Sequence, residues 1–351
     1  MSLRERFGWT PFFEHQAASL GRLDLRFARI VEEQRGLYRI AGDAEGWAEV
    51  SGRFRHEAVN AADFPAVGDW VGVEGGIIHV RLERRGTVSR KAAGRATDEQ
   101  VVAANVDVIF LVTALTQDLN TRRLERYLTM VWDAGAVPVV VLNKADLCDD
   151  PAAARDAVRA RLPLIDVLAV SALEDAGLDV LRPYLRPAQT VALLGSSGVG
   201  KSTLVNRLLG ADTLRVGAIS AADGRGRHTT TARQLVELPG GALLIDTPGM
   251  RELQPWGDES AVAAAFDDVA ALAAACRFTD CAHYSEPGCA VRDAVEAGRL
   301  DPDRLENFQR LGREAAYEAR KHDKTAAAEH KRRWKQLHQA QKAMYRDRDR
   351  R

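Results

Sequence analysis

The segment Gly195–Ser202 has the residue types and spacing of a loop that holds phosphate groups. Its glycines allow backbone N–H groups to turn inward around phosphate oxygens, and the helix expected to follow adds partial positive charge. Lys201 can reach β- and γ-phosphates, and the Ser202 hydroxyl can ligate Mg²⁺. The predicted phosphate-binding residues are Gly195, Ser196, Ser197, Gly198, Val199, Gly200, Lys201, Ser202 and Thr203.

A second motif, Asn143-Lys144-Ala145-Asp146, follows an apolar run at 137–142 and suits a guanine base. The Asp146 carboxylate can accept hydrogen bonds from guanine N1–H and the N2 amino group, two donors that adenine lacks at those positions. Asn143 can brace the loop and the base, and the stem of Lys144 can cover the ring. Ser171 and Ala172 end the next expected strand, where a backbone N–H could meet guanine O6. Together with the phosphate loop, these residues predict a guanine nucleotide site.

The γ-phosphate side of such a site is predicted at Asp246–Gly249, which follows the apolar run 242–245. Asp246 can hold a water molecule on Mg²⁺, and the Gly249 N–H can sense the γ-phosphate. Many GTPases place a water-positioning glutamine directly after this glycine. Met250 occupies that position and cannot orient water. Another group must position the water, or hydrolysis is very slow.

The segment 224–231 lies between the phosphate loop and Asp246, where a mobile switch is expected. Thr230 is the threonine predicted to ligate Mg²⁺ and to bond the γ-phosphate. His228 is predicted to position or deprotonate the attacking water, because histidine titrates near neutral pH. The alternatives for His228 are an ordinary loop histidine or a contact to RNA phosphate. Lys201, Thr230 and His228 are therefore the predicted catalytic residues.

The order of these motifs is unusual. In ordinary GTPases the phosphate loop precedes the base-reading loop, whereas here Asn143–Asp146 comes first in the chain. The same pocket can form from the permuted order, because function depends on the spatial arrangement of a site. The permutation sends the chain from Gly249 directly into a new C-terminal region.

That C-terminal region contains a predicted metal centre. Three thiols and one imidazole make a complete tetrahedral Zn²⁺ shell, which leaves no open coordination position and therefore indicates a structural site. Clustered cysteines in a cytosolic chain favour a metal over disulfides. Cys148 stands apart and is predicted to be a small core residue. The predicted zinc ligands are Cys276, Cys281, His283 and Cys289.

The elements that must position these residues fall into several segments. Short alternating segments between turn residues predict an oligonucleotide-binding (OB) type β barrel. Apolar runs alternating with helical stretches predict a parallel sheet covered on both faces. The predicted class is multi-domain α+β, with a tail at 1–20, the OB-type barrel at 21–90, a basic linker at 84–100, a circularly permuted GTPase domain at 101–255, and a zinc-binding helical domain with a basic C-terminal helix at 256–351.

Composition limits the possible partners and location. The 351 residues carry no net charge, but ten Lys/Arg and three Asp/Glu from Lys324 to Arg351 make that tail +7. A basic tail on an acidic body suggests contact with a polyanion, although a solvated charged helix would give the same pattern. No apolar run reaches the roughly 18–20 residues of a membrane helix. The first residues lack a signal-peptide pattern, so a cytoplasmic protein is predicted.

The combined motifs resemble one family, the circularly permuted GTPases known as ribosome small-subunit-dependent GTPase A (RsgA, also YjeQ or EngC). The resemblance spans nearly the whole chain. The matching stretches are 65–71 in the barrel, 103–108 at the start of the GTPase domain, 226–231 in the switch, and the cysteine cluster with Glu286–Cys289.

This resemblance implies an N-terminal OB fold, a permuted GTPase domain and a C-terminal zinc domain. It implies GTP hydrolysis that the small (30S) ribosomal subunit stimulates, late in the maturation of that subunit. The family's histidine beside the switch threonines corresponds to His228, and its hydrophobic replacement of glutamine to Met250. The expected ligands are GTP or GDP, Mg²⁺ and one structural Zn²⁺. The expected partners are the 30S subunit and 16S rRNA, with no membrane and a monomeric protein.

The expected mechanism is a switch in which GTP orders the 221–232 loop and the Asp246 turn, and hydrolysis releases the protein from the subunit. The barrel and the basic tail are expected to bind rRNA mainly through phosphates. Two alternatives remain open. One is a non-enzymatic rRNA-binding assembly clamp that uses nucleotide as a structural ligand, and the other is a permuted GTPase of large-subunit assembly.

Overall fold

The computed structural model describes residues 2–34, 36–91, 99–116, 119–162, 164–196, 198–210, 233–246, 265–278, 281–284 and 286–313, with only the backbone at 90, 91, 99 and 246. The chain divides into two compact units. The larger unit comprises Met1–Lys91 and Asp98–Pro255, and the smaller comprises Ala92–Thr97 and Trp256–Arg351. In the described residues, no helix has the length and apolar character needed to cross a membrane.

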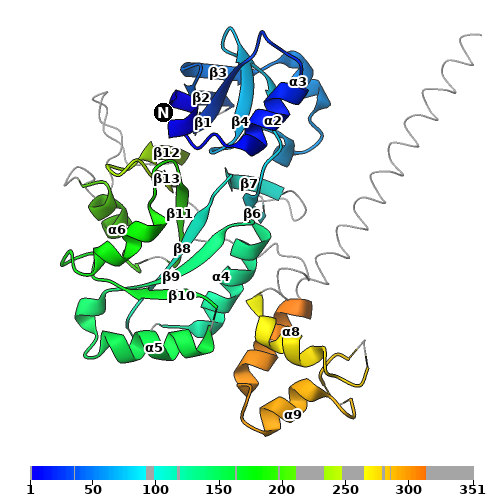
Figure 1. Ribbon diagram of the computed structural model, residues 1–351, viewed down its shortest axis with the longest axis vertical. Coiled ribbons are helices and arrows are strands. Elements are labelled where there is room, and N and C mark those ends of the chain that lie inside the picture. Colours follow the sequence, from blue (N-terminus) through cyan, green and yellow to red (C-terminus); the bar gives the residue numbers. More distant parts are fainter. Residues whose placement is uncertain are drawn as a thin grey trace, which may run out of the picture. The chain divides into compact units, whose positions relative to one another are not determined.

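The N-terminal region of the larger unit is a closed five-stranded barrel (Figure 1). The strands lie in the order β1-β2-β3-β5-β4, and β4 pairs back onto β1 to close the sheet. Side chains alternate between buried and exposed along β2, as expected for a strand with one face in a core. This architecture confirms the predicted barrel. Its strands are β1 (Arg26–Gln34), β2 (Leu37–Gly42), β3 (Gly46–Val50), β4 (Trp70–Glu74) and β5 (Ile77–Arg81), with α3 (Gly52–Glu57) and η1 (Ala61–Asp63) between β3 and β4.

Residues 2–20 pack against this barrel. They form two short helices, α1 (Leu3–Arg6) and α2 (Pro11–Ser19). The Trp9 ring meets the Trp70 ring edge-on at a centroid distance of 4.7 Å, and Phe13 is fully buried in the same aromatic cluster. The cluster therefore fixes the N-terminal helices to the barrel.

The basic linker predicted for 84–100 is wrong. The structure has an antiparallel pair there, β6 (Thr87–Lys91) with β7 (Glu99–Ala104). The strand signal was obscured because basic residues surround the few apolar positions. Val88 of this segment is buried, as is Ala103, which faces it from β7.

The GTPase region of the larger unit is a parallel sheet with helices on both faces. Its strands lie in the order β10-β9-β8-β11-β13, and each neighbouring pair is parallel. The helices α6 and α4 lie on opposite sides of β8 and β11 in Figure 1. This confirms the predicted α/β arrangement. The elements are β8 (Val108–Ala114), α4 (Thr121–Asp133), β9 (Val137–Asn143), η2 (Ala145–Leu147), α5 (Pro151–Arg161), β10 (Asp166–Ala169), η3 (Leu178–Tyr184), β11 (Thr190–Leu194), α6 (Lys201–Leu208), β12 (Arg233–Glu237) and β13 (Leu243–Asp246).

The barrel and the GTPase region share a continuous sheet. Strand β12 pairs antiparallel with β13 on one side and with β1 of the barrel on the other, where Glu32 faces Gln234 and Glu33 faces Arg233. A fully buried arginine, Arg29 of β1, reinforces this junction. Its guanidinium donates to Gly68 O (3.0 Å) and to Thr190 Oγ1 of β11 (2.8 Å).

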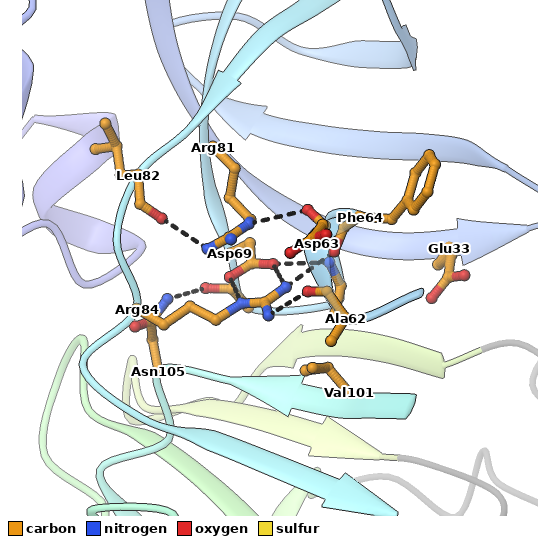
Figure 2. A network of polar contacts seen from close by, with 12 residues as sticks. Glu33, Ala62, Asp63, Phe64, Asp69, Arg81, Leu82, Arg84, Val101 and Asn105 are labelled. Carbon is orange, nitrogen blue, oxygen red and sulfur yellow. Dashed lines mark hydrogen bonds and ion pairs between the residues drawn. The ribbon is translucent and has the colours of Figure 1, made fainter. Parts of the chain in front are cut away.

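A second polar network lies beside this junction, where β5 leads into β6 (Figure 2). Arg84 forms a two-pronged ion pair with the buried Asp69 carboxylate, at 2.8 and 2.6 Å. The same guanidinium donates to the carbonyl oxygens of Ala62 and Phe64. The Asp69 carboxylate and the two carbonyl oxygens therefore accept hydrogen bonds from an arginine side chain that is only 9% exposed, as a largely buried charge requires.

The described portion of the smaller unit is helical. It contains α8 (Asp267–Ala273), α9 (Ala290–Glu296) and a helical stretch at 302–313. Arg304 pairs with Asp268 at 2.6 Å, and its guanidinium lies 4.7 Å from the centre of the buried Phe266 ring. The helices therefore meet around a small core that a charge pair supports.

Candidate nucleotide site and metal centre

Three of the predicted loops lie at one edge of the parallel sheet. The 143–146 loop follows β9, Ser171 and Ala172 come shortly after β10, and the 195–200 loop follows β11. Because these strands are parallel, their carboxyl ends meet at the same edge, which is where ligands bind in open α/β sheets.

Asn143 joins the three loops directly. Its side chain is buried, with Nδ2 donating to Val199 O of the phosphate loop (2.9 Å). Its Oδ1 accepts from the backbone N–H of Ala172 at 3.0 Å. One carboxamide thus uses its donor and its acceptor to connect the base-reading loop with both other loops.

The base-reading loop has a fixed conformation. Lys144 has a left-handed backbone (φ 62°), which turns the chain into η2, and Ala145 N donates to Val170 O at 3.1 Å. The exposed Asp146 carboxylate accepts a hydrogen bond from the hydroxyl of Ser171. The carboxylate predicted to read guanine and its predicted helper therefore meet, although they come from different strands.

The helper loop is held from its other side by α6. Arg207 donates from Nε to Ala172 O (3.0 Å) and from Nη2 to Leu173 O (2.8 Å). Ser171 also pairs with Ala176 in an isolated antiparallel β-bridge. The N–H of Ala172 donates to the Asn143 side chain. The backbone of this loop is therefore held by the Asn143 side chain on one side and by the Arg207 side chain on the other.

The phosphate loop needs its glycines for space as well as for conformation. Gly195 (φ 151°) and Gly200 (φ 94°) have positive φ, where a side chain is strained. A Cβ on Gly195 would overlap the carbonyl oxygen of Val112, and one on Gly200 would overlap Nδ2 of Asn143. Lys201 opens α6, and its Nζ donates to Gly195 O (2.7 Å) and Ser196 O (2.5 Å).

The structure adds a residue that the sequence analysis missed. Arg123, in the first turn of α4, donates from Nη1 to Ser196 Oγ of the phosphate loop at 2.6 Å. In the sequence Arg123 is one of two adjacent arginines at the start of an expected helix, a pattern typical of solvent-exposed helices. Only the fold places it at the phosphate loop, 73 positions away.

Several predicted site residues lie outside the described residues of the chain. They are Ser197, His228, Thr230 and Gly249, and the basic tail from Lys324 lies there too. Asp246 is described by its backbone alone, as the last residue of β13. Since β13 is parallel to β11, this backbone ends at the same sheet edge as the phosphate loop.

In the smaller unit, the four predicted zinc ligands converge. Their donor atoms all lie within 4.8 Å of one another. Nδ1 of His283 is 3.7 Å from Sγ of Cys276 and 3.5 Å from Sγ of Cys289, and those two sulfurs are 3.9 Å apart. Zn–S bonds of about 2.3 Å and a Zn–N bond of about 2.0 Å in a tetrahedron give separations of about 3.8 and 3.5 Å. Cys276, Cys281, His283 and Cys289 therefore fit Zn²⁺.

The conformation of the loop around His283 suits metal binding. Burial lowers the pKa of His283, which favours the neutral imidazole that a metal requires. Its backbone is left-handed (φ 62°), and its carbonyl accepts from Gln309 Nε2 at 2.8 Å. The Glu286 carboxylate accepts from the backbone N–H groups of Ala282 and Tyr284, which closes the turn.

Comparison with known proteins agrees with this geometry. The family model described as RsgA GTPase matches residues 81–256. The Small ribosomal subunit biogenesis GTPase RsgA of Opitutus terrae is 48% identical over 352 residues, which covers 96% of each protein. The protein of the same name from Xanthomonas axonopodis pv. citri is 48% identical, over 84% of this chain and 82% of the relative.

Two solved structures have the same architecture. YjeQ from Thermotoga maritima superposes with a TM-score of 0.62 at 25% identity, covering 83% of this chain and 99% of YjeQ. YloQ, described as a circularly permuted GTPase, gives a TM-score of 0.59 at 26% identity and covers 83% of this chain and 95% of YloQ. The permuted order of the motifs in this sequence therefore has a precedent in a solved structure, that of YloQ.

Proposed function

This chain belongs to the RsgA GTPase family and is a hydrolase that acts on GTP, and from that premise we propose that it binds the small ribosomal subunit and acts late in the maturation of that subunit. In this proposal the 30S subunit stimulates hydrolysis, and hydrolysis releases the protein. The printed names of the relatives, small ribosomal subunit biogenesis GTPases, support the choice of partner.

We assign the nucleotide contacts to the three joined loops. Asp146 reads the guanine edge with Asn143, Lys144, Ser171 and Ala172 around it, while Lys201 and the 195–203 loop hold the phosphates. The observation that carries this assignment is the pair of bonds from Asn143 to Val199 and Ala172, because it connects base-reading and phosphate loops in one site.

Mg²⁺ and the attacking water complete the site. Ser202, Thr230 and Asp246 would hold Mg²⁺, which supplies charge neutralisation on the β- and γ-phosphates. His228 positions the water, since Met250 cannot. Lys201 and Thr230 bind the γ-phosphate that the water attacks.

Zn²⁺ has a structural role in this proposal. Three thiolates and one imidazole fill a tetrahedral shell, so the donor set leaves no position for a reactant. When bound, Zn²⁺ would instead stabilise the loop between α8 and α9, because the sequence of this loop has few apolar residues that could form a core of their own.

We further propose that the barrel and the basic tail contact 16S rRNA, and that the protein acts as a cytoplasmic monomer. Support for a role of the barrel comes from the shared sheet, in which β1 pairs with β12, the strand that directly follows the predicted switch segment. Backbone hydrogen bonds between β1 and β12 therefore connect the barrel to that strand.

The test is co-sedimentation and single-turnover hydrolysis with purified subunits. We expect the protein to co-sediment with small subunits in the presence of a non-hydrolysable GTP analogue, to dissociate with GDP, and to hydrolyse GTP faster when small subunits are added. Equal turnover with and without small subunits would favour the assembly-clamp alternative. Preferential binding to large subunits would favour the other alternative.

A further inference from the structure

Hydrolysis in this site requires a source of transition-state stabilisation. Phosphoryl transfer develops charge on the γ-phosphate oxygens and on the β–γ bridging oxygen, and GTPases supply an arginine against it from within the chain or from a partner. The position that often carries glutamine is Met250, which brings no polar group. A cation close to the phosphate loop could stabilise the charge that develops on these oxygens.

Arg123 is a cation that lies beside the phosphate loop. The side chain of Asn120 caps α4 by accepting from Arg123 N at 3.1 Å, which fixes the first turn of the helix. From this turn the guanidinium reaches Ser196 Oγ at 2.6 Å, while Nζ of Lys201 donates to the carbonyl of the same Ser196 at 2.5 Å. Two cations from different helices thus converge on one residue of the phosphate loop.

The charge of Arg123 is available for a phosphate. Within the described ranges, its guanidinium bonds only to the neutral Ser196 hydroxyl and pairs with no carboxylate. The side chain is partly buried, so water screens its charge less than on an open surface. A partly buried guanidinium with free donors suits an anion with several oxygens, because its donors form a planar fork.

We propose that Arg123 is an intrinsic arginine of this GTPase, anchored by Ser196 and turned toward the γ-phosphate when GTP is bound. In the reaction the water oxygen forms a bond to Pγ while the bond from Pγ to the bridging oxygen breaks. The electron pair remains on GDP, and the proton of the water leaves with phosphate or solvent. Arg123 stabilises the negative charge on the departing oxygen and the transferring group. This role rests on the proposed assignment of 195–202 as the phosphate loop.

The experiment compares Arg123→Ala and Arg123→Lys with the unchanged full-length protein in single-turnover hydrolysis, with and without small subunits. We expect Arg123→Ala to lower the hydrolysis rate about 10³-fold, the lower end of the effect of such arginines. GDP affinity should change less than threefold, and binding of GDP with aluminium fluoride, a mimic of the transferring phosphoryl group, should be lost. Arg123→Lys should recover some of the rate, because it keeps the charge but not the fork.

Two further variants separate the possible failures. Arg159→Ala removes an exposed arginine of α5 and should behave as the unchanged protein. Lys201→Ala should lose both GTP and GDP, and if it does not, the phosphate-loop assignment itself is wrong. If Arg123→Ala instead weakens GDP and GTP equally and still binds GDP with aluminium fluoride, Arg123 only braces the loop and the proposal is overturned.

Discussion

Asn143 shows how one side chain can assemble a site from segments that are distant in the sequence. It is buried and 2% exposed, it donates to Val199 O, and it accepts from Ala172 N. Asn143→Leu would leave that carbonyl and that N–H unpaired, which costs about 1–3 kcal/mol for each group. We expect GTP and GDP affinity to fall together, measured with a fluorescent nucleotide. A loss confined to GTP would contradict this shared role of the residue.

In the proposed site, the charge of Asp146 would set the choice of base. Guanine presents two donors to this carboxylate, while xanthine has a carbonyl oxygen in place of the amino group. Asp146→Asn replaces one acceptor with an amide donor, so GTP affinity should fall roughly 10- to 150-fold, from the 1.5–3 kcal/mol of a hydrogen bond to a charged group. Xanthosine triphosphate should then bind better than GTP. The matched control is Asp149→Asn, an exposed carboxylate three residues away, and an unchanged preference for GTP in Asp146→Asn would remove Asp146 from the base site.

At the scale of elements, the sequence predicted those features whose signal is local. The strands that became β8, β9, β10 and β11 are apolar runs, and β9, β10 and β11 are each followed by a loop that was predicted to bind nucleotide. The four predicted zinc ligands are recognisable by their residue types and spacing, and their donor atoms converge in the fold. The β6–β7 pair and the contact of Arg123 with Ser196 were missed because each depends on pairing between segments, which no local pattern encodes.

The cluster of three cysteines and His283 in the smaller unit provides a prediction at this scale. Cys289 is buried and its sulfur lies 3.5 Å from His283 Nδ1, so Cys289→Ser removes a predicted ligand without changing the size of the side chain much. We expect bound zinc, measured by elemental analysis, to fall from about one per chain to near zero, together with faster amide exchange in α8 and α9. Cys148→Ser changes a thiol outside the cluster and should retain the metal. Full zinc occupancy in Cys289→Ser would mean that the ligand set is different.

At the scale of the whole molecule, the buried junction at Arg29 ties the barrel and the GTPase sheet into a single unit. Burial lowers the pKa of Arg29 to about 10, which still leaves the guanidinium charged at neutral pH. Besides Gly68 and Thr190, it donates to Phe7 O (2.7 Å) in the N-terminal segment and to Asn105 O (3.1 Å) at the entrance to β8. One side chain therefore satisfies acceptors in the N-terminal segment, the barrel and the GTPase sheet.

This arrangement predicts that nucleotide binding stabilises the barrel as well as the GTPase sheet. A ligand that binds only the folded state slows every opening that includes its site, so the exchange of barrel amides in β2 and β3 should slow when GTP analogue is added. Arg29→Ala should cost about 3 kcal/mol or more, because it leaves several buried acceptors unpaired. In that variant the barrel amides should exchange at the same rate with or without nucleotide, while α6 remains protected by it. Arg26→Ala, an exposed arginine on the same strand, should keep the coupling. If barrel protection in Arg29→Ala still follows the nucleotide, the β1–β12 pairing alone transmits it, and the arginine is only a local support.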